Sequence, residues 1–153
     1  MSKAFESTFQ VGWGDMDFNA HMKNTAYLDL SADTRMMYFA ANGFEMREFE
    51  RLRIGPVIVR DELDYYRESR LLESVTVNLT AAGLGTDGSR FRLRNEFFRE
   101  GGKLAARVTS TGGWLDLEAR RWTVPPDALR LLIEALPRAD DFHELESSLR
   151  PAQ

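Results

Sequence analysis

The chain has 153 residues, of which 43% are hydrophobic and 29% are charged, and its net charge is −4. This composition predicts one folded domain with a single core. The acidic balance argues against a nucleic-acid-binding protein, whose surface would be basic. The absence of cysteine excludes disulfides, thiolate metal ligands and a cysteine nucleophile. With two histidines, the chain is not expected to build a zinc site.

Targeting and membrane-spanning segments are not expected. The first ten residues, MSKAFESTFQ, lack the apolar run of a signal peptide, and no stretch of the sequence approaches the length of a membrane span. The sequence therefore predicts a cytoplasmic protein that does not enter a membrane.

The first third of the chain is expected to hold a strand followed by a long helix. Residues 5–13 have the mixed alternation of a strand. Residues 25–41 carry apolar side chains around most of the helical circumference, which predicts a helix that is buried on nearly all sides. Asn42-Gly43 is typical of a helix C-terminus.

The middle of the chain is expected to be β-sheet. After a charged connector over residues 44–55, apolar and polar residues alternate with the period of two that a strand shows. Asp87-Gly88 is typical of a hairpin turn. The predicted strands are residues 57–66, 74–82, 89–99 and 103–117.

A short helix and a polar tail are expected to complete the chain. Pro125-Pro126 opens an amphipathic pattern typical of a helix, and Pro137 ends that pattern. Residues 138–153 are polar and predict a loosely held tail. The expected domain therefore covers residues 1–137.

These elements predict an α+β fold in which an antiparallel β-sheet wraps around one long buried helix. The edge strands of such a sheet have backbone groups without partners. Association of two copies through an edge strand is therefore expected.

Residues 14–24 read GDMDFNAHMKN and lie where the first strand passes into the long helix. Two carboxylates, a histidine and an asparagine stand close together here, which indicates either a polar loop or an active site. Aspartates ahead of a helix commonly cap it, and this structural role is favoured for Asp15.

The segment from residue 11 to residue 39 combines several polar and aromatic features in a fixed order: Asp17, Ala20-His21, Lys23-Asn24, Tyr27-Leu28, and Asp33 with Arg35. In this order they resemble the signature of hotdog-fold acyl-CoA thioesterases of the 4-hydroxybenzoyl-CoA thioesterase type. Residues 55–77 resemble the second and third strands of the same family. Three positions differ from the family pattern: Ala20 stands where glycine is common, Lys23 replaces an asparagine, and a proline often seen before the third strand is replaced near Ser69. Alanine resists the positive φ that a glycine would adopt.

The resemblance implies the hotdog fold and hydrolysis of an acyl-CoA to a free acid and CoA, by a homodimer or homotetramer that needs no cofactor. It assigns Asp17 as the hydrolytic carboxylate, either as general base or as nucleophile. N–H groups in the first turn of a helix lack internal partners. Those of Asn24 and Thr25 are therefore expected to polarise the thioester carbonyl. His21 is expected either to order the loop or to contact the substrate.

Further residues are candidates for substrate binding. Tyr27, Tyr65, Tyr66 and the methionines of the long helix are expected at the acyl pocket, where core packing explains them equally well. CoA carries phosphates, so Arg90 and Arg92 are candidates to bind it, although arginines also alternate in this way on the solvated face of a strand.

Two other functions stay open at this point. One is a hotdog dehydratase or hydratase acting on β-hydroxyacyl or enoyl thioesters. The other is a non-catalytic protein that binds acyl-CoA or an acyl carrier. The sequence does not identify the acyl group.

Overall fold

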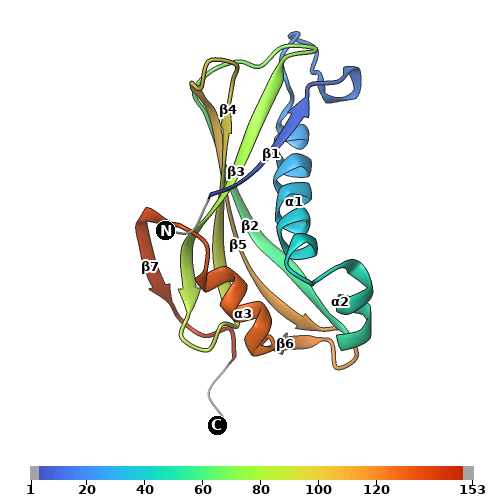
Figure 1. The fold of residues 1–153 in the computed structure, drawn as a ribbon, viewed down its shortest axis with the longest axis vertical. Coiled ribbons are helices and arrows are strands. Elements are labelled where there is room, and N and C mark those ends of the chain that lie inside the picture. Colours follow the sequence, from blue (N-terminus) through green and yellow to red (C-terminus); the bar gives the residue numbers. More distant parts are fainter. Residues whose placement is uncertain (1–3, 150–153) are drawn as a thin grey trace.

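The computed structural model describes residues 4–149. Its elements follow one another as a strand, a short 3₁₀ turn, two helices, five strands, a third helix and a last strand (Figure 1). In chain order they are β1 (Phe5–Gln10), η1 (Trp13–Asp15), α1 (Asn24–Ala41), α2 (Met46–Leu52), β2 (Ile54–Tyr65), β3 (Ser74–Gly85), β4 (Arg90–Phe98), β5 (Leu104–Asp116), β6 (Arg121–Thr123), α3 (Asp127–Glu134) and β7 (Arg138–Leu145).

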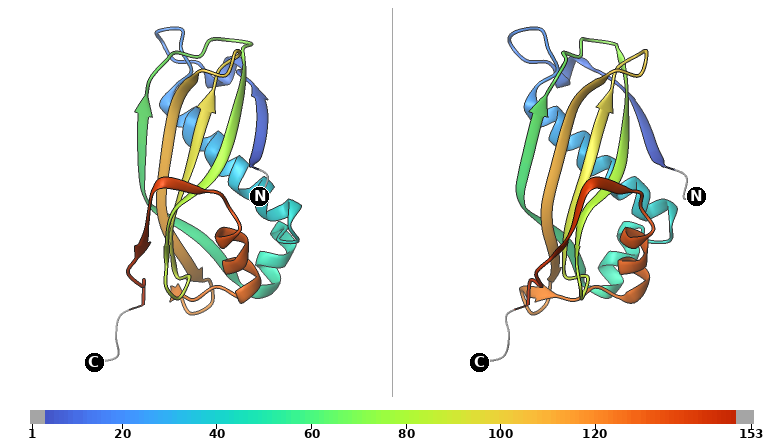
Figure 2. Two further views of the ribbon diagram at one scale, coloured as in Figure 1. Left: turned by 60° about the vertical axis from the view of Figure 1, so that its left-hand side comes forward. Right: turned by 90° about the vertical axis from the view of Figure 1, so that its left-hand side faces the viewer.

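The strands form one curved sheet in which β1, β3, β4, β5 and β2 follow one another from edge to edge. All pairs along this path are antiparallel. The short strand β6 pairs with β5, and β7 pairs in parallel with β3. Helix α1 runs along one face of the sheet, and β7 lies on the opposite side (Figures 1 and 2). The α+β class and the antiparallel sheet around one long helix agree with the prediction.

The core fills the space between α1 and the sheet. One end is aromatic, with Phe39, Phe49 and Phe91 packed around the fully buried Trp114. The other end lies beneath the start of α1 and is built from smaller aliphatic side chains around Tyr27. Large buried rings of this kind supply much of the apolar area that drives folding.

Helix α1 is buried on one side, which corrects the expectation of burial on nearly all sides. Its buried residues are Ala26, Tyr27, Ser31, Thr34, Tyr38 and Phe39. Met37 is 47% exposed. The apolar residues outside the buried stripe have no layer above them in a single chain, because the sheet covers only one face of the helix.

Several boundaries differ from those predicted; β2, for example, begins at Ile54 rather than at residue 57, and β3 ends at Gly85 rather than at residue 82. The first strand ends at Gln10 rather than at residue 13, because residues 13–15 form the turn η1. Helix α1 begins at Asn24, one residue before the predicted start at residue 25. The charged connector contains helix α2, whose single buried residue is Phe49; one apolar anchor in a short charged segment is too weak a pattern to predict a helix.

The predicted tail is partly a strand, which also moves the end of the ordered fold beyond residue 137. Residues Arg138–Leu145 form β7, and Ala81 N–H donates to Pro137 O at 2.9 Å where this strand joins β3. The strand is polar because it lies on the solvent side of the sheet, where Asp141 pairs with Arg94. Its sequence therefore lacks the apolar alternation on which the prediction depended. Residues 150–153 of the predicted tail lie outside the described part of the chain.

Candidate active site

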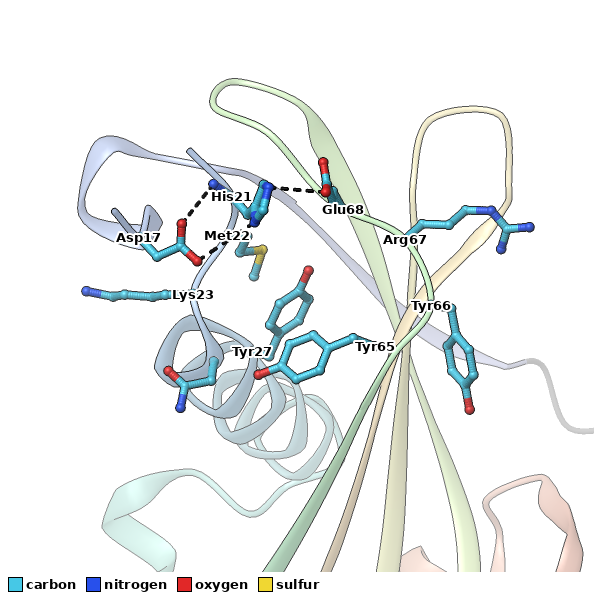
Figure 3. A pocket seen from close by; sticks show the side chains of 10 residues that line it. Asp17, His21, Met22, Lys23, Tyr27, Tyr65, Tyr66, Arg67 and Glu68 are labelled. Carbon is cyan, nitrogen blue, oxygen red and sulfur yellow. Dashed lines mark hydrogen bonds and ion pairs between the residues drawn. The ribbon is translucent and has the colours of Figure 1, made fainter. Parts of the chain in front are cut away.

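A cavity of about 410 Å³ lies between the start of α1 and the end of β2 (Figure 3). Two segments of the chain form it: the motif loop over residues 17–24 with the first turn of α1, and the end of β2 with the residues after it. The lining residues are Asp17, His21, Met22, Lys23, Asn24, Tyr27, Tyr65, Tyr66, Arg67 and Glu68.

Asp17 is held by the backbone of its own loop. Its Oδ1 accepts the N–H of Asn19 at 2.8 Å and that of His21 at 3.0 Å. The Asp17 N–H in turn donates to His21 O at 2.7 Å. The hydrogen bond from the His21 backbone, followed by that from Asn19, lowers the pKa of Asp17 from its ordinary value near 3.8. The carboxylate is therefore ionised at neutral pH.

Ala20 adopts the left-handed conformation that the loop requires, with φ of 64°. Its N–H closes the turn by donating to Asp17 O at 3.3 Å. A residue with a Cβ is strained at this φ. The loop therefore has the shape that a glycine would allow, and the hydrogen bonds of Asp17 hold Ala20 in it.

His21 lies between two carboxylates. Its Nε2 is 3.1 Å from Glu68 Oε1, and its Nδ1 is 4.0 Å from Asp17 Oδ2 (Figure 3). The next residue, Met22, donates its N–H to Ser69 O at 2.9 Å. The loop is thus attached to the segment that follows β2 at two adjacent positions.

The N-terminus of α1 faces the same cavity. Lys23 is the N-cap residue, and its carbonyl accepts the N–H groups of Ala26 and Tyr27. Within residues 4–149, the N–H groups of Asn24 and Thr25 have no acceptor, as expected for the first turn of a helix. Asn24 lines the cavity and Thr25 does not.

Asp15 has a structural role. Its Oδ2 accepts the N–H of Gly12 at 2.8 Å, which closes η1. Its backbone carbonyl accepts the N–H of Lys23 at 2.8 Å and so fixes the residue ahead of α1. Asp15 does not line the cavity, so it braces the loop from outside.

Two tyrosines form the inner wall. Tyr27 is buried, and its ring lies 5.8 Å from that of Tyr65 and 5.0 Å from that of Phe97. Burial raises the pKa of the Tyr27 hydroxyl; burial and then the charge of Asp17 raise the pKa of Tyr65. Both hydroxyls therefore stay protonated at neutral pH.

Tyr66 also lines the cavity but does not face Tyr27. Consecutive strand residues point to opposite faces, so Tyr66 turns away from Tyr65 (Figure 3) and lies beneath the guanidinium of Arg107, 5.9 Å from its ring centre. Tyr65 is thus the residue of the pair that faces Tyr27.

The structure places Arg90 and Arg92 away from this cavity. Both are on β4 and neither is among the lining residues. Arg92 contacts Asp141 at 3.3 Å and Glu62 at 3.9 Å, on the face of the sheet opposite α1. The cationic residues among the lining are Lys23 and Arg67, on opposite sides of the cavity; their side chains extend away from it (Figure 3), and the Arg67 guanidinium donates to Leu104 O at 2.7 Å.

Four lining residues were not predicted: Met22, Lys23, Arg67 and Glu68. Lys23 is adjacent to Asn24 and could have been inferred from that position. Glu68 and Arg67 follow β2 in an ordinary charged stretch, and nothing local distinguishes them. Only the return of this segment to the motif loop makes them part of a site.

Among residues 4–149, no group of His, Asp or Glu side chains has an arrangement that could hold a metal ion. No helix in the same range is long and apolar enough to cross a membrane.

The sequence matches the Thioesterase-like superfamily over residues 11–133. The chain therefore belongs to this superfamily, which confirms the resemblance found in the motif and the class of enzyme that it implies. No curated protein matches the chain in sequence.

Solved structures confirm the hotdog fold. The protein SAV2348 of Staphylococcus aureus, solved in complex with CoA, is similar with a TM-score of 0.80 and 21% identity, over 91% of this chain and 89% of that one. Slr0204, a 1,4-dihydroxy-2-naphthoyl-CoA thioesterase from Synechocystis, is similar with a TM-score of 0.75 and 17% identity, over 86% of this chain and 96% of that one. YbaW, a probable thioesterase of Escherichia coli, is similar with a TM-score of 0.72 and 20% identity, over 88% of this chain and 99% of that one. At these identities the likeness establishes the fold.

Proposed function

We propose that this chain hydrolyses the thioester bond of an acyl-CoA, with Asp17 as the hydrolytic carboxylate. One observation carries the proposal: the ionised carboxylate of Asp17 and the helix residue Asn24, whose first-turn N–H has no acceptor within residues 4–149, line the same cavity. Thioester hydrolysis needs these two elements, a group that delivers the nucleophile and donors that stabilise the developing oxyanion.

The chemistry begins with the thioester oxygen directed at the N–H of Asn24, with that of Thr25 beside it. In one route, Asp17 removes a proton from water while the hydroxyl adds to the carbonyl carbon. The oxyanion accepts hydrogen bonds from the helix N-terminus. Its collapse breaks the C–S bond and leaves the free acid and the CoA thiolate, which takes up the proton from Asp17.

In the other route, a carboxylate oxygen of Asp17 adds directly to the carbonyl carbon. The C–S bond then breaks, CoA leaves as the thiolate and a mixed anhydride remains. Water hydrolyses this anhydride, which regenerates the Asp17 carboxylate and releases the acid, and the second proton of that water goes to the thiolate. Rapid quenching followed by mass spectrometry separates the two routes, because an acyl group on Asp17 forms only in the second.

Substrate binding is proposed to use residues of the same cavity. Tyr27 and Tyr65 would contact the part of the acyl group next to the thioester. Lys23 and Arg67 would contact the phosphates of CoA in place of Arg90 and Arg92, since cations at a pocket mouth attract such groups. The CoA complex of the similar staphylococcal protein supports CoA as the ligand type.

A homodimer or homotetramer is proposed for the active form. The support is the partly exposed α1 and the free edge strand β2, since an unpaired edge favours association. The cytoplasmic location stays a prediction from the sequence.

The activity is tested by following free thiol with a thiol reagent over a panel of aliphatic and aromatic acyl-CoAs. We expect thiol release from at least one of them. Hydration of an enoyl-CoA without thiol release would instead identify a hydratase. Binding of acyl-CoA without turnover of any panel member would identify a binding protein.

Asp17→Asn is the decisive variant. The amide oxygen of Asn can still accept the N–H groups of Asn19 and His21, so the loop is expected to survive and acyl-CoA to bind. We expect kcat to fall by about 10³-fold or more. Asp15→Asn is the matched control and should keep its activity, because Asp15 does not line the cavity. Unchanged hydrolysis in Asp17→Asn would place the chemistry elsewhere.

A further inference from the structure

The segment after β2 fixes the motif loop through two neighbouring residues. Ser69 accepts the backbone N–H of Met22 at 2.9 Å, and the Glu68 carboxylate meets the ring of His21 at 3.1 Å. Figure 3 shows Glu68 and Asp17 on opposite sides of the His21 ring. A backbone contact alone would hold the loop in place, so the side-chain contact calls for a separate explanation.

The contact with Glu68 determines which nitrogen of a neutral His21 ring carries the proton. The 3.1 Å between Nε2 and Oε1 is a hydrogen-bond distance, and an ionised carboxylate can only accept. Nε2 must therefore be the donor. The proton position of one ring nitrogen sets the role of the other, so Nδ1 of the neutral ring carries a lone pair.

That lone pair faces the proposed hydrolytic carboxylate. The separation of 4.0 Å between Nδ1 and Asp17 Oδ2 is too long for a direct hydrogen bond. Nδ1 and Asp17 are instead placed to accept hydrogen bonds from one and the same group, either water or a polar atom of the substrate. A water that donates to two acceptors has fewer possible orientations than one that donates to a single carboxylate.

We infer that Glu68 is a positioning residue for the reaction: it holds His21 with the proton on Nε2 and thereby presents the Nδ1 lone pair beside Asp17. The inference rests on the proposed function, since it gives His21 a task next to the hydrolytic carboxylate. Glu68 does not act on the substrate itself.

A purely structural role for Glu68 predicts a different pattern of effects. The side chains of His21 and Glu68 are 36% and 54% exposed, and ion pairs so open to water contribute little to stability. Among residues 4–149, the other oxygen of Glu68 makes only a long contact with Arg70, at 3.9 Å. Loss of the Glu68 side chain should therefore affect turnover much more than folding.

The first test reads the proton position directly and requires no turnover. The chain has two histidines, so long-range ¹H–¹⁵N spectra contain two imidazoles, and His143→Gln assigns them. At about pH 9, well above an ordinary histidine pKa of about 6.5, we expect His21 to carry its proton on Nε2. Glu68→Ala should shift the population towards Nδ1–H. A proton on Nδ1 in the wild type, or an unchanged spectrum in Glu68→Ala, would overturn the inference.

The second test is kinetic. Glu68→Ala should lower kcat by about tenfold, with KM changed less than twofold and an unchanged melting temperature. Glu68→Gln keeps an acceptor oxygen for Nε2–H and should recover most of the activity. Arg70→Ala is the matched control, because it removes the other contact of Glu68 and leaves the ring contact intact; its kcat should equal that of the wild type.

The two tests separate the possible failures. If the wild type hydrolyses no thioester, the proposed function fails, while the spectra still decide whether Glu68 sets the tautomer. If the wild type is active and Glu68→Ala changes the spectrum but not kcat, the positioning role is refuted and the contact is structural.

Discussion

Asp17 and His21 are bound to each other in both directions. The Asp17 N–H donates to the His21 carbonyl at 2.7 Å, and the His21 N–H donates to Asp17 Oδ1 at 3.0 Å. These two hydrogen bonds close a short turn that fixes Oδ1 of Asp17. The other oxygen, Oδ2, is left on the side of the His21 imidazole. A carboxylate held in this way has little freedom to lose when substrate binds, which is the condition for efficient positioning.

The residue inside this turn gives a stability prediction. Ala20→Gly should raise the free energy of unfolding by about 0.5–1 kcal/mol, because glycine adopts the φ of 64° without strain. Urea unfolding of both proteins measures the difference. Ala32→Gly, in the middle of α1, is the control and should lower the free energy of unfolding by about 1 kcal/mol. A loss of stability in Ala20→Gly would mean that Ala20 is not strained.

The pKa of Asp17 predicts the acid limit of activity. Hydrolysis needs the ionised carboxylate, and the backbone N–H groups of His21 and Asn19 hold its pKa below the ordinary 3.8. The value of kcat/KM should therefore stay level as the pH falls towards about 4 and decline only below that. Circular dichroism at each pH shows whether the fold persists. A midpoint above about pH 5, with the fold intact, would contradict this assignment.

Lys23 and Arg67 predict a difference between the binding of an acyl-CoA and that of an acyl-pantetheine, which carries the same thiol arm without the nucleotide. Lys23→Ala and Arg67→Ala should each raise KM for an acyl-CoA severalfold at low salt, since each removes one positive charge from the site. The same variants should leave KM unchanged for the matching acyl-pantetheine, which lacks the nucleotide phosphates. Added salt should reduce the difference in KM for acyl-CoA between the wild type and each variant.

The control for this experiment is Lys103→Ala, in the turn between β4 and β5 and outside the cavity lining. Its KM for acyl-CoA should match that of the wild type. An equal increase in KM for acyl-CoA and acyl-pantetheine in Lys23→Ala would show that Lys23 acts on the shape of the cavity rather than on phosphate.

Asp141 is predicted to hold β7 to the sheet in a pH-dependent manner. Its carboxylate accepts two hydrogen bonds from Arg94, at 2.7 and 2.9 Å, and these lower the pKa of Asp141 well below 3.8. Arg94 is 8% exposed, whereas the Asp141 side chain is 53% exposed. Asp141→Asn should therefore lower the free energy of unfolding by only about 1 kcal/mol at pH 7.

The sign of the pH dependence follows from the lowered pKa. The stabilisation is fully present above the unfolded-state pKa near 3.8 and is lost as the pH falls from there through the folded-state value. The gap between wild type and Asp141→Asn in urea unfolding should thus be constant from about pH 5 upwards and close at lower pH. Asp140→Asn is the control, because Asp140 makes no ion pair within the described residues. A gap that widens in acid would contradict the assignment.

Local patterns in the sequence determined the helices α1 and α3, the strands β1 to β5 and the motif, but not α2, β6 or β7. Alternation with a period of two located four strands, and an apolar helical pattern located α1, because both patterns depend on side chains only a few residues apart. The motif identified Asp17, His21 and Asn24 together, since all three belong to one continuous segment. The turn at Ala20 was likewise foreseeable from a single position.

Only the tertiary structure decided which distant residues meet this segment. The partners Glu68 and Ser69 belong to the stretch after β2, and its path back to the loop depends on the pairing of β2 with β5 along the sheet. Strand pairing also placed Arg92 beside Asp141 rather than at the cavity, and turned Tyr65 towards Tyr27 and Tyr66 away from it. A shift of one residue in strand register exchanges the two faces of a strand. No short-range pattern specifies such non-local choices, so they emerge only when the whole sheet has formed.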